Sequence, residues 1–285
     1  MLRGAASWRG GYAGGVAVRR PLLQLRGVAS EPMCLIAFAW NVHPRWRLIL
    51  AGNRDELHAR PSAPLAHWSG SPVMAGRDLL AGGTWLGVTS GGRCAVVTNV
   101  RDPHAAMDGQ SRGLLVSEFL AGTDAADAHA ERLRARAADY RPFNLLLFDG
   151  GQAAFVGNHP MPHGRTLEPG LHALSNADLD TPWPKVLAIR QALQAWLAQA
   201  DGDPQALFAA LADERLAPDA QLPVTGIGLP LERRLSSAFV RGEAYGTRAS
   251  TVVAIAHDGS GFVVERGFGP SGQTGVETRL DFAAD

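Results

Sequence analysis

Short apolar runs separated by turn residues restrict the fold of this chain more than any other feature of its sequence. Such runs fill most of residues 34–100, whereas residues 111–139 carry apolar and alanine positions at three- and four-residue spacing. The first pattern predicts strands and the second predicts helices. Strands therefore come first, helices follow, and the strand pattern returns near the C-terminus, without a regular alternation of single strands and helices. This order predicts an α+β fold of layered, mostly antiparallel sheets.

The same patterns give the bounds of the individual elements. We expect strands at residues 34–40, 46–53, 71–76, 84–90, 94–100, 143–150, 152–158, 171–177, 249–259, 261–268 and 276–282. We expect helices at residues 111–122, 125–139, 182–200 and 203–214. Thr123 and Asp124 are candidate caps of the second helix, and Asp180 or Thr181 of the third.

Residues 1–32 differ from the rest of the chain. They contain five arginines, no lysine and one acidic residue, Glu31. Three explanations stay open: a processed leader that would direct import into an organelle, an upstream extension from a start codon chosen in error, and a functional tail. All three exclude this segment from the fold, and we expect it to be disordered. Residues 33–285 show no Pro/Gly/Ser-rich linker and are therefore expected to form a single domain.

Bulk composition argues against several classes of function. Lys+Arg and Asp+Glu both total 27, so the net charge is zero and nothing indicates a nucleic-acid partner. The two cysteines favour a reducing compartment, and we expect the cytoplasm. No apolar run approaches the roughly 18–20 residues of a transmembrane helix. The scattered histidines predict no metal site, and without a dinucleotide or phosphate-binding motif we expect no required cofactor.

The Met33–Cys34 step opens the first expected strand. If the mature chain began at Cys34, one residue would carry both a thiol and a free α-amino group, which is a nucleophile together with its base. The amino group, with a pKa near 7.7–8.0, would accept the thiol proton at neutral pH. The alternative is structural, because cysteine in an apolar strand is usually a core residue.

The run Asn53-Arg54-Asp55-Glu56 lies in the stretch "AGNRDELHARPSAPLAHW". The blocks "MCLIAF", "GGTWLGV", "TNVR", "SRGLLVSEFL", "FNLLLFD", "LSNADLDTPWPKV", "YGTRASTVV" and "ETRLDF" surround it in order. Together they resemble the NRDE family, which includes the eukaryotic transport and Golgi organisation 2 proteins, so residues 33–285 are expected to be one NRDE domain. The layout also resembles the N-terminal-nucleophile cysteine hydrolases. That resemblance implies a four-layer αββα sandwich of antiparallel sheets.

The two resemblances imply roles for eight residues. In the hydrolase reading, Cys34 attacks a carbonyl, Arg54 favours its thiolate, Asp55 holds the α-ammonium and an asparagine amide stabilises the oxyanion. The catalytic candidates are Cys34, Asn53, Arg54, Asp55 and Asn176, and the ligand-binding candidates are Glu56, Asn99 and Arg248. The hydrolases, however, separate their arginine and aspartate by two residues, whereas Arg54 and Asp55 are adjacent. The NRDE run also has a structural alternative, a buried charge network that fixes the first hairpin.

Two classes of function follow. The first is a carrier that binds or traffics a hydrophobic acidic ligand, such as haem, a lipid or an acyl-coenzyme A, which the family resemblance implies more directly. The alternative is an N-terminal cysteine amidohydrolase or acyltransferase, with Cys34 as the nucleophile after removal of Met33. A third hypothesis is an assembly protein that binds no ligand. The first two differ in whether the amino group of Cys34 must be free.

Overall fold

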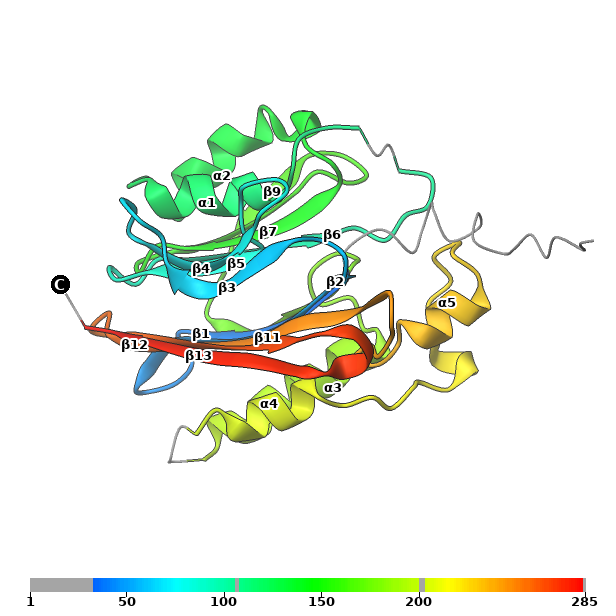
Figure 1. Ribbon diagram of the computed structural model, residues 1–285. Coiled ribbons are helices and arrows are strands. Elements are labelled where there is room, and N and C mark those ends of the chain that lie inside the picture. The colour runs from blue at the N-terminus through cyan, green and yellow to red at the C-terminus, as the bar shows by residue number, and fades with distance from the viewer. Residues whose placement is uncertain (1–32, 106–107, 200–202, 284–285) are drawn as a thin grey trace, which may run out of the picture.

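The computed structural model describes residues 33–105, 108–199 and 203–283. Two antiparallel sheets face each other, and helices cover the outer face of each sheet (Figure 1). The predicted α+β fold, a four-layer αββα sandwich, is confirmed. The leader expected at residues 1–32 lies outside the described residues.

The first sheet has six strands in the order β10-β1-β2-β11-β12-β13, and the second has seven in the order β3-β4-β5-β6-β7-β8-β9. The strands of the first sheet are β1 (Met33–Trp40), β2 (Trp46–Leu57), β10 (Gly170–Leu174), β11 (Tyr245–Ala256), β12 (Gly261–Phe268) and β13 (Thr274–Phe282). The strands of the second are β3 (Ser62–His67), β4 (Val73–Asp78), β5 (Leu86–Thr89), β6 (Cys94–Asn99), β7 (Phe143–Phe148), β8 (Ala153–Gly157) and β9 (His163–Thr166).

Most of the helices form the two outer layers, whereas the last α-helix lies to one side of the sandwich (Figure 1). The α-helices are α1 (Gly113–Ala121), α2 (Ala126–Arg134), α3 (Pro184–Leu197), α4 (Gln205–Leu211) and α5 (Leu229–Arg234), and the 3₁₀ turns are η1 (Ala137–Asp139), η2 (Asp219–Gln221) and η3 (Pro270–Gly272). Helices α1 and α2 pack on the second sheet, and α3 and α4 pack on the first. Within the described part of the chain, no helix is long and apolar enough to span a membrane.

Strand β1 lies at the centre of the packing, and all eight of its residues are buried. Cys34 and Ile36 face the second sheet, whereas Leu35 and Ala37 face the helices α3 and α4. Successive side chains of a strand point to opposite faces, so a strand that is covered on both faces is apolar throughout. This explains why "CLIAFAW" is a continuous apolar run and does not alternate.

Both predicted helix caps were wrong. Among the described residues, neither Thr123 nor Asp124 caps α2; the amide of Ala126 donates instead to Asp149 Oδ2 at 2.6 Å, from the β7–β8 turn. Helix α3 begins at Pro184, and its N-cap is Trp183. A carboxylate from a distant turn takes the place of a local cap, which local sequence patterns do not reveal.

Asn53 connects β2 to the helical layer. Its Nδ2 donates to the backbone oxygens of Leu211 and Ala238, both at 2.8 Å, and its Oδ1 accepts from Ser250 Oγ at 2.6 Å. The side chain is fully buried. Its amide therefore satisfies two carbonyls that are otherwise cut off from water.

We expect Asn53→Ala to lower the free energy of unfolding by about 3 kcal/mol, because two buried carbonyls lose their donors. Chemical denaturation measures the change. The exposed Gln191→Ala on α3 is the control and should shift stability by less than about 0.5 kcal/mol. An Asn53→Ala variant as stable as the original chain would contradict this structural role.

Candidate functional site

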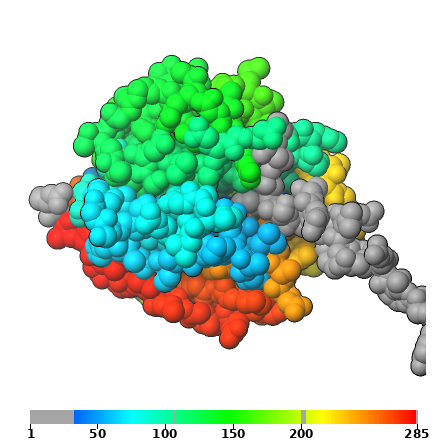
Figure 2. Space-filling view, turned by 45° about the horizontal axis from the view of Figure 1, so that its top comes forward, coloured from blue at the N-terminus to red at the C-terminus, as the bar shows by residue number. Residues whose placement is uncertain are grey.

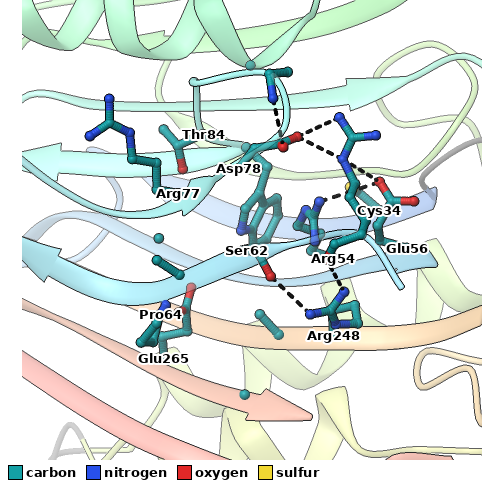
Figure 3. A pocket seen from close by; sticks show the side chains of 18 of the residues that line it. Cys34, Arg54, Glu56, Ser62, Pro64, Arg77, Asp78, Thr84, Arg248 and Glu265 are labelled. Atoms are coloured by element: carbon teal, nitrogen blue, oxygen red, sulfur yellow. Dashed lines mark hydrogen bonds and ion pairs between the residues drawn. The ribbon is translucent and has the colours of Figure 1, made fainter. Parts of the chain in front are cut away.

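A cavity of about 590 Å³ lies between the two sheets (Figure 3). Six arginines and three acidic residues line it, together with apolar side chains that include Trp85, Val97 and Phe268. The arginines are Arg54, Arg60, Arg77, Arg112, Arg141 and Arg248, and the acids are Glu56, Asp78 and Glu265. The lining thus carries an excess of positive groups, although the whole chain has no net charge.

The NRDE run divides between the two faces of β2. Arg54 and Glu56 line the cavity. Asn53 bonds to α4 on the opposite face, and Asp55 is fully buried near Lys185 of α3. Adjacent residues of a strand must point in opposite directions, so Arg54 and Asp55 act on opposite sides of the first sheet.

Cys34 lines the cavity, with 3% of its surface exposed. Burial raises the pKa of its thiol to about 12, and the nearby Asp55 carboxylate adds to this, while Arg54 and Arg112 act in the opposite direction. In the chain as it stands, the thiol is therefore protonated at neutral pH. The backbone nitrogen of Cys34 is part of the peptide bond with Met33.

Met33 is held firmly in front of Cys34. Its backbone nitrogen donates to the hydroxyl of Tyr245 at 3.1 Å. Its side chain is 2% exposed and packs with Leu235, Val240 and Tyr245. The Met33–Cys34 bond is thus an ordinary interior peptide bond of β1.

Beneath this step, Asp55 and Lys185 form a buried pair of ionisable groups. Asp55 Oδ1 accepts from Thr247 Oγ1 at 2.6 Å, but Asp55 Oδ2 and Lys185 Nζ lack hydrogen-bond partners among the residues that the structure describes. Burial raises the pKa of Asp55 to about 6 and lowers that of Lys185 to about 8. Lys185 is the single lysine of the whole sequence, a signal that could have marked it as a candidate residue.

The two candidate asparagines are joined to each other. Asn176 Nδ2 donates to Asn99 Oδ1 at 2.8 Å and to the Asn99 backbone oxygen at 3.2 Å. Asn99 lines the cavity, and its own Nδ2 is buried without a partner in the described part of the chain. Asn99 therefore has the amide that remains available to a ligand oxygen, and Asn176 orients it.

Arg248 and Glu56 organise the crossing from the first sheet to the second. Arg248 Nη1 donates to the backbone oxygens of Leu57 and Arg60, at 2.8 and 3.0 Å, and Nη2 donates to Ser62 Oγ at 3.0 Å (Figure 3). Glu56 Oε2 pairs with Arg54 at 3.4 Å and with Arg60 at 3.6 Å. These bonds hold the β2–β3 connection against the cavity.

Arg112 was not predicted as a site residue, although it lies in the block "SRGLLVSEFL". Its loop packs so closely on the "GGTWLGV" block that a Cβ at Gly83 would lie 2.3 Å from the carbonyl carbon of Gly113. The Thr84 amide donates to the Gly113 oxygen at 3.1 Å. Glycine at both positions thus lets two distant blocks meet and directs Arg112 into the cavity. Glu265, which also lines it, was missed as well.

Comparison with known proteins identifies the family. The family model "Transport and Golgi organisation 2" matches residues 33–270, which is most of the chain. The chain belongs to this family. The NRDE-family resemblance is thereby confirmed, and the match begins at Met33.

Several members of the transport and Golgi organisation 2 family are similar along nearly their whole length. The chain is 31% identical over 268 residues to the Homo sapiens homolog, covering 87% of this chain and 97% of that protein. It is 32% identical over 255 residues to the Mus musculus homolog, covering 82% and 92% respectively. The Drosophila melanogaster protein is 27% identical over 274 residues, with 85% and 95% covered.

Two solved structures are similar in fold. One is the N-acylethanolamine-hydrolyzing acid amidase ortholog of Caenorhabditis elegans, with a TM-score of 0.48 and 13% identity, covering 77% of this chain and 92% of that chain. The other is a mutant of the conjugated bile acid hydrolase from Clostridium perfringens, with a TM-score of 0.48 and 8% identity, covering 87% and 92%. At this level of similarity, residue roles do not transfer.

The depressed pKa of Lys185 predicts a specific pH dependence. The folded state disfavours the ammonium, so the unfolded chain binds more protons between about pH 8 and 10.5, and Lys185 adds stability as the pH rises through that window. In an Asp55→Asn background, where the coupled carboxyl no longer titrates, we expect Lys185→Met to increase stability at pH 7. This gain should shrink toward pH 10.5.

Denaturation curves of Asp55→Asn and Asp55→Asn/Lys185→Met, recorded at several pH values, measure this difference directly. Titrating groups that do not interact with Lys185 contribute equally to both variants and cancel, and Cys34, which does interact with it, is replaced by serine in both variants. If the stability difference between the two variants does not change with pH, burial does not disfavour the ammonium form of Lys185.

Proposed function

We propose that this protein binds and carries a small anionic ligand with an apolar body, in the cavity between the two sheets. The observation that carries the proposal is the lining, in which six arginines and three acids stand beside apolar walls. The pairs that Arg60 forms with Asp78, at 2.7 Å, and with Glu56 account for two of the three acids. With six arginines against three acids the lining keeps a net positive charge for an anionic head group, and Arg54, which shares Glu56 with Arg60, belongs to this set.

Among the ligands that the family resemblance implies, an acyl-coenzyme A or another acyl lipid fits better than haem. Arginines suit carboxylates and phosphates equally, so the head group does not decide between them. Haem also takes an axial ligand from the protein, usually His, Cys, Met or Tyr. Among the described residues that line the cavity, Cys34 alone offers such a side chain, and its thiol is held protonated. The names of the relatives, which refer to transport, support a carrier role, and we propose the cytoplasm as its compartment.

A specific observation also favours the hydrolase alternative. Asp55 Oδ2 lacks a partner within the described residues, and Asp55 pairs in register with Met33, directly beside the nitrogen that would become an α-amine. Removal of Met33 would free an α-amine there. This amine would accept the thiol proton and become an ammonium, and the sulfur would attack an amide or thioester carbonyl. The ammonium would return that proton to the departing amine or thiol, and water would hydrolyse the resulting thioester to a carboxylic acid and the free thiol. Asn99 Nδ2 is the donor available to the oxyanion.

The carrier proposal predicts saturable binding of palmitoyl-coenzyme A by Cys34→Ser, because an acyl ligand does not need the thiol. Haem, for which Cys34 is the candidate axial ligand among the described cavity residues, is tested on the original chain. Arg54→Gln should weaken binding of palmitoyl-coenzyme A at least about tenfold, through loss of one charge-assisted hydrogen bond. Isothermal titration calorimetry measures both affinities. Arg215→Gln, whose side chain is 88% exposed, is the matched control and should bind normally. Absence of saturable binding of either ligand would reject the proposal.

The hydrolase alternative predicts that the native protein begins at Cys34. Intact-mass analysis determines the first residue and detects an acyl group on the thiol after incubation with an acyl-coenzyme A. Cys94→Ser should retain that adduct and Cys34→Ser should lose it, since Cys94 is fully buried away from the cavity lining. Native protein that still carries residues before Cys34 would exclude this chemistry.

A further inference from the structure

Exposed apolar side chains stand on both sides of the cavity mouth. Leu79 and Leu80, in the turn between β4 and β5, are 58% and 68% exposed, and Val276 of β13 is 63% exposed. Leu80 and Val276 both line the cavity. They belong to opposite sheets, whose edges meet along one face of the molecule, where the cyan segment lies above the red C-terminal strands (Figure 2). Single exposed apolar residues are ordinary, but this group surrounds an opening.

The turn that presents the two leucines is well fixed. Asp78 Oδ1 accepts from the amides of Leu80 and Ala81, at 2.9 and 3.1 Å, and the amide of Leu79 donates to the Pro61 oxygen at 3.0 Å. Asp78 Oδ2 pairs with Arg60, which also approaches Glu56 inside the cavity. The backbone of the turn is therefore satisfied internally, while its two leucines have no packing role in the core.

The charges at this mouth are mainly basic. Arg77 and Arg141 are exposed and line the cavity from the second sheet. The Arg77 guanidinium lies over the Trp68 ring, 4.6 Å from its centroid, and also lies beside the turn, where its Nε donates to the Gly82 oxygen. Asp78, the acid in this turn, is already engaged by Arg60. An apolar tip flanked by arginines complements a surface that is apolar inside and anionic outside.

We propose that this rim, formed by Leu79, Leu80 and Val276 with Arg77 and Arg141, docks onto an anionic lipid surface. The leucines enter the acyl region, and the arginines contact lipid phosphates. Three apolar side chains are too few for the roughly 800 Å² per partner of a stable protein interface, which argues against a second copy as the occupant. Docking would turn the cavity mouth toward the lipid, so an acyl ligand reaches the cavity without crossing water. This ligand route rests on the proposed function, whereas the docking itself does not.

The first test is co-sedimentation of the full chain with vesicles of phosphatidylcholine and phosphatidylglycerol. Leu79→Glu/Leu80→Glu should reduce the bound fraction at least about tenfold, because two charges cannot enter the acyl region. Val224→Glu, at a residue that is 98% exposed and outside the cavity lining, is the control and should bind normally. Equal binding by the double variant and the original chain would overturn the proposal.

The second test localises the contact, because the arginine-rich residues 1–32 could by themselves attract the chain to anionic vesicles. Cys34 and Cys94 are buried, so Leu80→Cys can be labelled selectively with an environment-sensitive fluorophore. Anionic vesicles should shift its emission to the blue, and the same label on Val224→Cys should not respond. Vesicle binding without a shift at residue 80 would overturn the assignment to this rim.

Two further readouts separate the alternatives. Sedimentation velocity without vesicles should show no self-association that depends on Leu79 and Leu80; a dimer lost in the double variant would assign the rim to a second copy instead. Calorimetry with palmitoyl-coenzyme A in solution uses Leu79→Glu alone, because Leu79 lies outside the cavity lining, and it should give the same affinity for this variant and the original chain. If neither binds, the proposed function fails while the docking result stands.

Discussion

The two-residue period of β-strands determines the organisation of this protein around Met33 and Cys34. In the hairpin of β1 and β2, Cys34, Arg54 and Glu56 face the space between the sheets, while Asn53 and Asp55 face the helices. A shift of register by one residue would exchange the two sets. The sheet thereby separates a cavity with an excess of cations from a buried charge network by the thickness of one strand.

The two sets of side chains lie in different electrostatic environments. Residues in the cavity remain within reach of solvent or ligand, so an excess of arginine is tolerable there and attracts an anion. On the helix side, Lys185 and Asp55 are fully buried. Each buried ion loses favourable solvation free energy, and only a close partner of opposite charge can offset this loss. Arg101 and Glu232 form a 2.8 Å ion pair, and the Arg101 guanidinium also stacks on the Trp183 ring, although burial still lowers the pKa of Arg101. Asp55 and Lys185 offset the loss only in part, which explains why their pKa values shift in opposite directions toward neutrality.

The sequence predicted the layers because apolar periodicity is local, and it predicted the family because its blocks are contiguous. It did not predict strands β3 and β9 or helix α5, whose residues are largely exposed and lack a periodic pattern. It also placed all four NRDE residues in one site and named Asn176 as a catalytic candidate and Asn99 as a ligand-binding one. Linear sequence does not show which side of a sheet a residue faces or which asparagine is already engaged. The position of Arg112 in the cavity could not be predicted without knowing that Gly83 and Gly113 are in contact. Lys185 alone could have been found, as the one lysine in an arginine-rich chain.

The packing of Met33 has a consequence for the timing of events in the life of the chain. Its side chain and amide are enclosed by Leu235, Val240 and Tyr245, residues that are synthesised some two hundred positions later. A peptidase that cleaves before Cys34 must therefore act before the first sheet is complete, since the folded sheet encloses its substrate. Release of the Cys34 amine would therefore depend on whether cleavage precedes folding, and a molecule that folds first would keep Cys34 in its peptide bond with Met33.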